Sequence, residues 1–160
     1  YATLLALTHR LREYDRALKS GAWERAGQFT MLDYPVRELA GRTLGIVGYG
    51  ALGRGVARVA EAFGMQVRVA NRVGGPPEPG RVDLDELLPQ VDVLSLHCPI
   101  TPATRHLIDA RRLARMKPDA ILINTARGGL VDAAALAAAL RAGRLGGAAI
   151  DVLEQEPPVD

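Results

Sequence analysis

Three glycines in the run Gly48-Tyr49-Gly50-Ala51-Leu52-Gly53 have the spacing that a diphosphate-binding turn requires. The apolar run 43–47 precedes them and a helical pattern follows, so the glycines lie where a strand turns into a helix. In such a turn Gly48 makes the tight bend, Gly50 lets the main chain approach a pyrophosphate, and Gly53 lets the helix pack close to the strand. Free N–H groups and the partial positive charge of the helix N-terminus favour an anion. The sequence therefore predicts a dinucleotide-binding site.

The end of the second strand bears on the choice between NAD and NADP. An acidic residue commonly receives the ribose 2'-hydroxyl there, about 20 residues past the glycines, but this chain has Asn71 and Arg72. A carboxylate would repel a 2'-phosphate, whereas a guanidinium binds it through paired hydrogen bonds. We therefore expect NADP to be preferred over NAD. The alternative is that Arg72 is a solvated charge beside the glycine- and proline-rich loop 74–80.

The segments that must position these residues alternate between strand and helix. Apolar or alternating patterns predict strands at 43–47, 66–70, 91–96, 120–124 and 147–152. The glycine turn opens one helix, whose predicted core stripe is Val56, Val59, Ala60 and Phe63. Asp83 caps a short second helix, and 132–142 forms a third. This alternation predicts an α/β fold with a doubly wound parallel sheet that binds ligands at the carboxyl ends of its strands.

We divide the chain into an arm of residues 1–40 and a dinucleotide-binding domain of residues 41–160, which together form one compact unit. Leucines and a tyrosine at helical spacing predict one long helix, which ends at Gly21-Ala22-Trp23; they are Leu4, Leu7, Leu11, Tyr14 and Leu18. Residues 28–39 are predicted to be extended or irregular. Trp23 and Phe29 are either packing residues or anchors into a partner subunit.

Composition indicates an ordinary soluble domain. The 160 residues carry a net charge of +2, and only 4% of them are aromatic, which argues against a nucleic-acid partner. Although 48% of the residues are hydrophobic, no apolar run is long enough to span a membrane, and no signal peptide is visible. The single cysteine, Cys98, excludes an internal disulfide and favours a cytoplasmic location. No metal site is predicted.

Three further segments resemble the D-isomer-specific 2-hydroxyacid dehydrogenases. They are Leu-His-Cys-Pro-Ile-Thr at 96–101, Ile-Asn-Thr-Ala-Arg-Gly-Gly-Leu-Val-Asp at 123–132 and Asp-Val-Leu-Glu-Gln-Glu-Pro at 151–157. Within the family, the chain is most similar to the glycerate dehydrogenase, or hydroxypyruvate and glyoxylate reductase, group. The resemblance implies a Rossmann-type cofactor domain and reversible hydride transfer between a nicotinamide cofactor and a small 2-hydroxy or 2-oxo acid.

The resemblance also implies individual roles. Arg127 binds the substrate carboxylate and polarises the carbonyl, for which a planar guanidinium is better suited than an ammonium. Glu156 hydrogen-bonds a histidine and keeps it protonated. Asp151 receives the nicotinamide carboxamide. The remaining cofactor contacts are Ala51 and Leu52 over the pyrophosphate, His97, Cys98, Pro99 and Thr104 beside the adenosine half, and Thr125 and Ala126 beside the nicotinamide ring, next to Arg127.

The acid/base histidine is the point at which the sequence departs from the family. It belongs in a segment beyond Glu156, and none of His9, His97 and His106 has its sequence context. We therefore expect an isolated cofactor domain that lacks the family's smaller substrate domain, binds nucleotide and turns over poorly alone. Two alternatives are a non-enzymatic, dinucleotide-sensing module similar to corepressors and a structural fragment without ligand affinity. The resemblance also implies a homodimer formed through the first helix and the arm.

Overall fold

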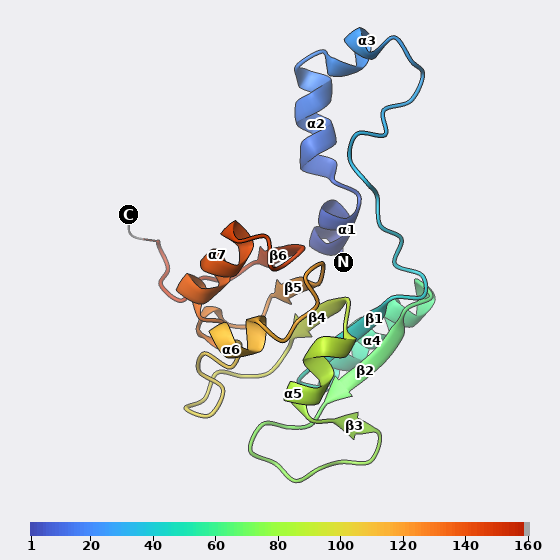
Figure 1. Cartoon of the computed structure of the whole chain (residues 1–160). Helices are drawn as coiled ribbons and strands as arrows, with labels where there is room; N and C mark the ends of the chain where they lie inside the picture. Colours follow the sequence, from blue (N-terminus) through green and yellow to red (C-terminus); the bar gives the residue numbers. More distant parts are fainter. Residues whose placement is uncertain (159–160) are drawn as a thin grey trace. The chain divides into compact units, whose positions relative to one another are not determined.

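The computed structural model describes residues 1–158 and holds a six-stranded parallel sheet in the order β3-β2-β1-β4-β5-β6 (Figure 1). The strands are β1 Thr43–Val47, β2 Gln66–Ala70, β3 Arg81–Val82, β4 Val93–Leu96, β5 Ile121–Asn124 and β6 Gly147–Ile150. The chain moves outward from β1 to β3 and then returns to the other side of β1. The carboxyl ends of β1 and β4 therefore form the switch point at which such sheets bind ligands. The predicted Rossmann-type fold is confirmed.

The connecting helices begin where the sequence supplies capping residues. They are α4 Ala51–Ala62, α5 Leu84–Leu87, α6 Ala110–Leu113 and α7 Ala133–Arg141, with 3₁₀ turns at Leu88–Gln90 and Gly128–Leu130. Asp83, Asp109 and Asp132 each accept a main-chain N–H of the first turn of α5, α6 and α7. The sequence analysis found α4, α5 and α7 but missed α6 and the two-residue strand β3.

Helices cover both faces of the sheet. On one face β4 and β5 pack against α5, α6 and α7 through buried leucines, namely Leu87, Leu94, Leu96, Leu113, Leu122 and Leu136. On the other face of β1, α4 buries Gly53, Ala57 and Ala60. The predicted α4 stripe was partly wrong, because Val59 and Phe63 are 42% and 40% exposed. Small residues face the sheet because they let the helix approach it closely.

The chain divides into two compact units, residues 1–39 and the residues from Ala40 onward. The first unit holds α1 Ala2–Thr8, α2 Leu11–Lys19 and α3 Ala22–Ala26, so the prediction of one long helix was wrong. The helix breaks at Arg10, whose φ of 53° is left-handed. Residues 28–39 contain no helix or strand, as predicted. The Tyr14 hydroxyl of α2 lies 2.9 Å from the carbonyl oxygen of Tyr34 and so holds the irregular segment against α2.

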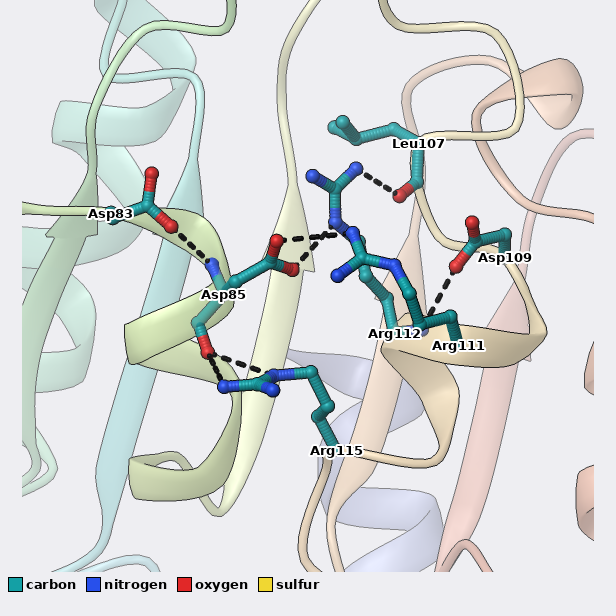
Figure 2. A network of polar contacts seen from close by, with 7 residues as sticks. All are labelled: Asp83, Asp85, Leu107, Asp109, Arg111, Arg112 and Arg115. Atoms are coloured by element: carbon teal, nitrogen blue, oxygen red, sulfur yellow. Dashed lines mark hydrogen bonds and ion pairs between the residues drawn. The ribbon is translucent and has the colours of Figure 1, made fainter.

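Asp85 joins α5 to α6 through a network of arginines (Figure 2). Its carboxylate accepts hydrogen bonds from Arg112 Nε at 2.9 Å and Arg111 Nη2 at 3.0 Å, and its carbonyl oxygen accepts one from Arg115 Nη2 at 2.9 Å. Arg112 also donates to the carbonyl oxygen of Leu107. The hydrogen bond from Arg112, aided by Arg111, lowers the pKa of the Asp85 carboxyl despite the opposing effect of burial.

Asp92 links separate segments in the same way, at the amino ends of β1 and β4. Its carboxylate accepts hydrogen bonds from the main-chain N–H of Thr43 at 2.7 Å and from Lys117 Nζ at 2.9 Å. Burial raises the pKa of this carboxyl, but the hydrogen bonds from Thr43 and Lys117 together outweigh it, so the pKa is lowered. Asp92 therefore ties the start of β1 to the loop before β5.

These two carboxylates predict that the sheet domain loses stability in acid. Because their folded pKa values lie below the unfolded ones, the stabilisation is present at neutral pH and is lost as the pH falls through the folded values. We expect the free energy of unfolding to be level above about pH 5 and to fall below about pH 4. Asp85→Asn should lower the free energy of unfolding at neutral pH by about 1 kcal/mol. It should also make that free energy fall less steeply as the pH is lowered. Urea unfolding measured across this pH range tests both; equal acid dependence in the variant and the wild type would contradict the role of Asp85.

Candidate functional site

The glycine turn after β1 is packed so tightly that two of its glycines admit no side chain. Gly48 has a φ of +94°, and a Cβ built there would lie 2.6 Å from the main-chain nitrogen of Cys98. A Cβ at Gly53 would lie 2.2 Å from the carbonyl oxygen of Gly48. The main chain of the turn therefore packs directly against the main chain of α4 and of the segment that leaves β4.

Gly50 differs from its neighbours because nothing lies near it. A Cβ built there meets no atom within 4 Å, yet Gly50 lines the cleft above the sheet. It is the N-cap of α4, whose first helical hydrogen bond runs from Arg54 N to Gly50 O, so the earlier N–H groups lack helical partners. The open face at Gly50 and these donors fit a diphosphate held by main-chain amides.

The cleft lies at the carboxyl ends of β1, β2 and β4 and has a volume of about 560 Å³. It brings together eight of the predicted cofactor residues: Gly48, Gly50, Asn71, Arg72, His97, Cys98, Pro99 and Thr104. It also contains Tyr49, Glu78 and Arg81, which the sequence analysis did not select. Ala51, Leu52 and Gly53 do not line it; Leu52 is 76% exposed and Gly53 is buried under the turn.

The loop after β2 places a carboxylate in the cleft although none follows the strand directly. The side-chain oxygen of Asn71 accepts the main-chain N–H of Glu78 at 3.1 Å, and the N–H of Asn71 donates to the carbonyl oxygen of Val82 at 2.7 Å. These bonds fold the loop back, so that Glu78 and Arg81 join Arg72 along the cleft. Glu78 thus brings an acid to this end of the cleft, although Asn71 and Arg72 stand directly after β2, as the sequence analysis noted. The pair Arg81-Val82 forms β3 just before the Asp83 cap. In the sequence this pair was a weak indication that the loop returns to the sheet.

His97 and Cys98 follow β4 and line the cleft. The Ser95 hydroxyl lies 2.8 Å from His97 Nε2. Burial lowers the pKa of His97 and raises the pKa of the Cys98 thiol, so both favour the uncharged form. Thr104 shapes the loop that follows, because its hydroxyl accepts the N–H of Thr101 at 2.7 Å and lies 2.8 Å from the carbonyl oxygen of Pro99. These groups suit contact with an adenosine rather than nucleophilic chemistry.

Asn124, which the sequence analysis did not select, shapes the loop that carries Arg127. It is fully buried at the end of β5. Its amide nitrogen donates to the carbonyl oxygen of Arg127 at 2.9 Å, and its amide oxygen accepts the N–H of Ala126 at 3.1 Å. Thr125 and Arg127 are exposed, and Arg127 Nη1 donates to the carbonyl oxygen of Ala126. The buried amide thus fixes the main chain from which the Arg127 guanidinium extends.

The segment after β6 packs against the same loop. Asp151 donates its main-chain N–H to the carbonyl oxygen of Asn124 at 3.0 Å, and a Cβ at Gly128 would lie 2.1 Å from the carbonyl carbon of Leu153. Glu156 accepts the N–H of Leu153 at 2.7 Å.

One ion-pair cluster holds this segment in place. Glu154 pairs with Arg105 and lies 3.2 Å from His106 Nε2.

The remaining predicted site residues lie outside the cleft, at the ends of β5 and β6 and in the segments that follow them. They are Thr125, Ala126, Arg127, Asp151 and Glu156.

Comparison with known proteins agrees with this arrangement. The family model "D-isomer specific 2-hydroxyacid dehydrogenase, NAD binding domain" matches residues 1–160. The chain belongs to the D-isomer-specific 2-hydroxyacid dehydrogenase family. It is an NAD(P)-binding domain of that family, and the resemblance inferred from the sequence is confirmed. No helix within residues 1–158 is long and apolar enough to cross a membrane.

Relatives of this dehydrogenase domain are close in sequence and structure. It is 50% identical to the glycerate dehydrogenase of Methylorubrum extorquens over 157 residues, which cover 98% of this chain and 49% of that protein. It is 42% identical to the glyoxylate reductase of Thermococcus litoralis, with 98% and 49% covered. The crystal structure of the TT0316 protein from Thermus thermophilus superposes with a TM-score of 0.85 at 43% identity, over 99% of this chain and 50% of that one. The chain thus spans about half the length of these relatives.

Proposed function

We propose that this domain belongs to an oxidoreductase that transfers a hydride between a nicotinamide cofactor, preferably NADP, and a small D-2-hydroxy acid. Glycerate with hydroxypyruvate and glycolate with glyoxylate are the proposed pairs, since relatives at 50% and 42% identity carry the names glycerate dehydrogenase and glyoxylate reductase. The observation that carries the proposal is the open position at Gly50 beside the start of α4, because a diphosphate fits there and a side chain would fill it. Named dehydrogenases and reductases among the relatives favour an enzyme over a corepressor-like sensor.

The chain's residues divide the work between the two ends of the cofactor. Gly48 and Gly53 shape the turn, and the main chain at Gly50 with the N–H groups of Ala51 and Leu52 holds the diphosphate. The adenosine end lies between Asn71 and Arg72 on one side and His97, Cys98, Pro99 and Thr104 on the other. Thr125 and Ala126 border the nicotinamide, and Asp151 accepts its carboxamide. When bound, the nicotinamide supplies or accepts the hydride.

Arg127 and Glu156 carry the substrate chemistry in this proposal. The Arg127 guanidinium holds the carboxylate of the acid and stabilises negative charge on the oxygen at C2. Glu156 orients an acid/base histidine and favours its protonated form. In this structure His97 pairs with Ser95 and His106 with Glu154, so neither histidine pairs with Glu156. We therefore expect residues 1–160 alone to bind cofactor and to turn over substrate slowly.

A titration tests the cofactor preference. Arg72 lines the cleft, and no carboxylate directly follows β2, so NADPH should bind the 160-residue chain about tenfold more tightly than NADH. Arg72→Gln should remove most of this difference, whereas Arg58→Gln, which removes an exposed charge on α4 outside the cleft, should preserve it. Equal binding of the two cofactors by the wild type would remove the preference for NADP.

Turnover tests the reaction. In a protein that joins this chain to a substrate domain of the family, NADPH oxidation with hydroxypyruvate or glyoxylate should proceed, and Arg127→Gln should reduce kcat/KM by about 1,000-fold without weakening NADPH binding. Arg58→Gln serves again as the charge-matched control. Turnover that survives the loss of Arg127 would exclude its proposed role.

The arm of the first unit supports a homodimer. Phe29 and Leu32 are 90% and 83% exposed, which is unusual for large apolar side chains close in sequence, and Trp23 donates its indole N–H to the carbonyl oxygen of Phe29. We expect light scattering to show a dimer for the wild type and a monomer for Phe29→Ser/Leu32→Ser. Leu140→Ser, at a 38% exposed position of α7, should stay dimeric. A monomeric wild type would contradict this proposal.

A further inference from the structure

Three charged side chains, from Arg72, Glu78 and Arg81, line the cofactor cleft. Arg72 follows β2 directly, whereas Glu78 and Arg81 reach the cleft only because the loop after β2 folds back onto β3. No step of the proposed reaction uses Glu78 or Arg81. They share the cleft with Arg72, and the main chain of Glu78 is hydrogen-bonded to Asn71, the neighbour of Arg72 in the sequence.

Arg81 is held between a carboxylate and an aromatic ring. Its Nη1 lies 2.8 Å from Glu78 Oε1, and its side chain is 23% exposed while that of Glu78 is 42% exposed. The guanidinium carbon lies 5.9 Å from the ring centroid of Tyr49, within the range of a cation–π contact. Tyr49 belongs to the phosphate-binding turn, so this contact keeps the Arg81 charge in the cleft independently of Glu78.

The ion pair is weak enough to be exchanged for a better anion. A partly exposed Glu–Arg pair contributes little, because solvent screens its charges. A phosphate offers a guanidinium a charge-assisted, paired interaction of the same kind with greater negative charge. A phosphate bound at Arg72 and Arg81 would, however, lie near the Glu78 carboxylate, which repels it.

We propose that Arg81 is a second binding residue for the 2'-phosphate and that Glu78, its ion-pair partner, reduces the selectivity of the cleft for phosphorylated adenosine. This inference rests on the proposed use of NADP at Arg72 and adds two residues to it. Glu78 attracts Arg81 away from the phosphate and repels the phosphate itself, so the pair moderates the preference that the two arginines create.

Calorimetric titration with 2',5'-ADP and 5'-AMP tests the pair on the 160-residue chain. These probes differ only in the 2'-phosphate and do not involve the nicotinamide end. Arg81→Gln should weaken 2',5'-ADP binding about tenfold and change 5'-AMP binding by less than about twofold. Glu78→Gln should strengthen 2',5'-ADP binding about threefold or more, a gain that a misfolded variant does not produce. Arg58→Gln, with the same loss of charge on the exposed face of α4, should change neither affinity by more than about twofold.

The outcomes separate this inference from the cofactor preference on which it rests. If Arg81→Gln matches Arg58→Gln while Arg72→Gln abolishes selectivity, Arg81 is not a phosphate ligand and the preference for NADP stands. If Glu78→Gln weakens 2',5'-ADP binding, the opposing role of Glu78 is overturned. If the wild type binds both probes equally but Glu78→Gln prefers 2',5'-ADP, the preference for NADP fails while the role of Glu78 is supported.

Discussion

Replacing Gly50 with alanine is expected to weaken NADPH binding by about 100-fold and to leave the fold intact. Nothing lies within 4 Å of the position where the new Cβ would stand, and its φ of −76° suits any residue. The methyl group would occupy the space in which a diphosphate meets the N–H groups at the start of α4. Titration of the variant and the wild type with NADPH measures the loss.

Gly55→Ala is the matched control for this change. Gly55 lies further along α4, and a Cβ there also meets nothing within 4 Å. Its substitution should leave NADPH binding unchanged. If Gly50→Ala binds NADPH as the wild type does, the diphosphate is not held at this turn, and the cofactor roles inferred for the neighbouring residues are lost with it.

Replacing Gly53 with alanine should instead damage the fold, lowering the free energy of unfolding by about 3 kcal/mol. The added Cβ would lie 2.2 Å from the carbonyl oxygen of Gly48, and neither main-chain segment can move without opening the turn from β1. Because the turn itself shifts, NADPH binding should fall as well. Urea unfolding followed by circular dichroism gives the stability.

The comparison with Gly55→Ala again isolates the cause. Alanine at an open helix position should raise the free energy of unfolding by up to about 1 kcal/mol, since glycine is the poorer helix former. Gly53→Ala and Gly55→Ala therefore have expected effects of opposite sign within the same helix. Equal stabilisation by both would show that α4 does not pack against the turn as described.

Local patterns were sufficient to predict most of the sheet and the glycine turn after β1. The strands β1, β2, β4, β5 and β6 are short apolar or alternating runs, and the Gly48 turn stands between one of them and a helix. Their parallel arrangement follows from the alternation of strand and helix. The two-residue strand β3 was missed because its side chains are too few to show a period.

Longer-range features were harder to predict because they depend on partners elsewhere in the chain. The α4 face was misjudged at Val59 and Phe63, since alanine and glycine carry little hydrophobic signal even where they pack against a strand. The break at Arg10 has no glycine or proline to mark it. Asn124 reads as the last residue of a strand, and only its two hydrogen bonds reveal that it shapes the Arg127 loop.

Residue order alone was enough to establish the family, the parallel sheet and the identity of the residues that follow most of its strands. These features depend on neighbours within a few positions, which a linear pattern records. The set of charges that share the cleft emerged only from the folded chain, because the hydrogen bonds of Asn71 bring Glu78 and Arg81 to Arg72 through the loop after β2. Charge interactions act through space over a few ångströms, whatever the separation along the chain.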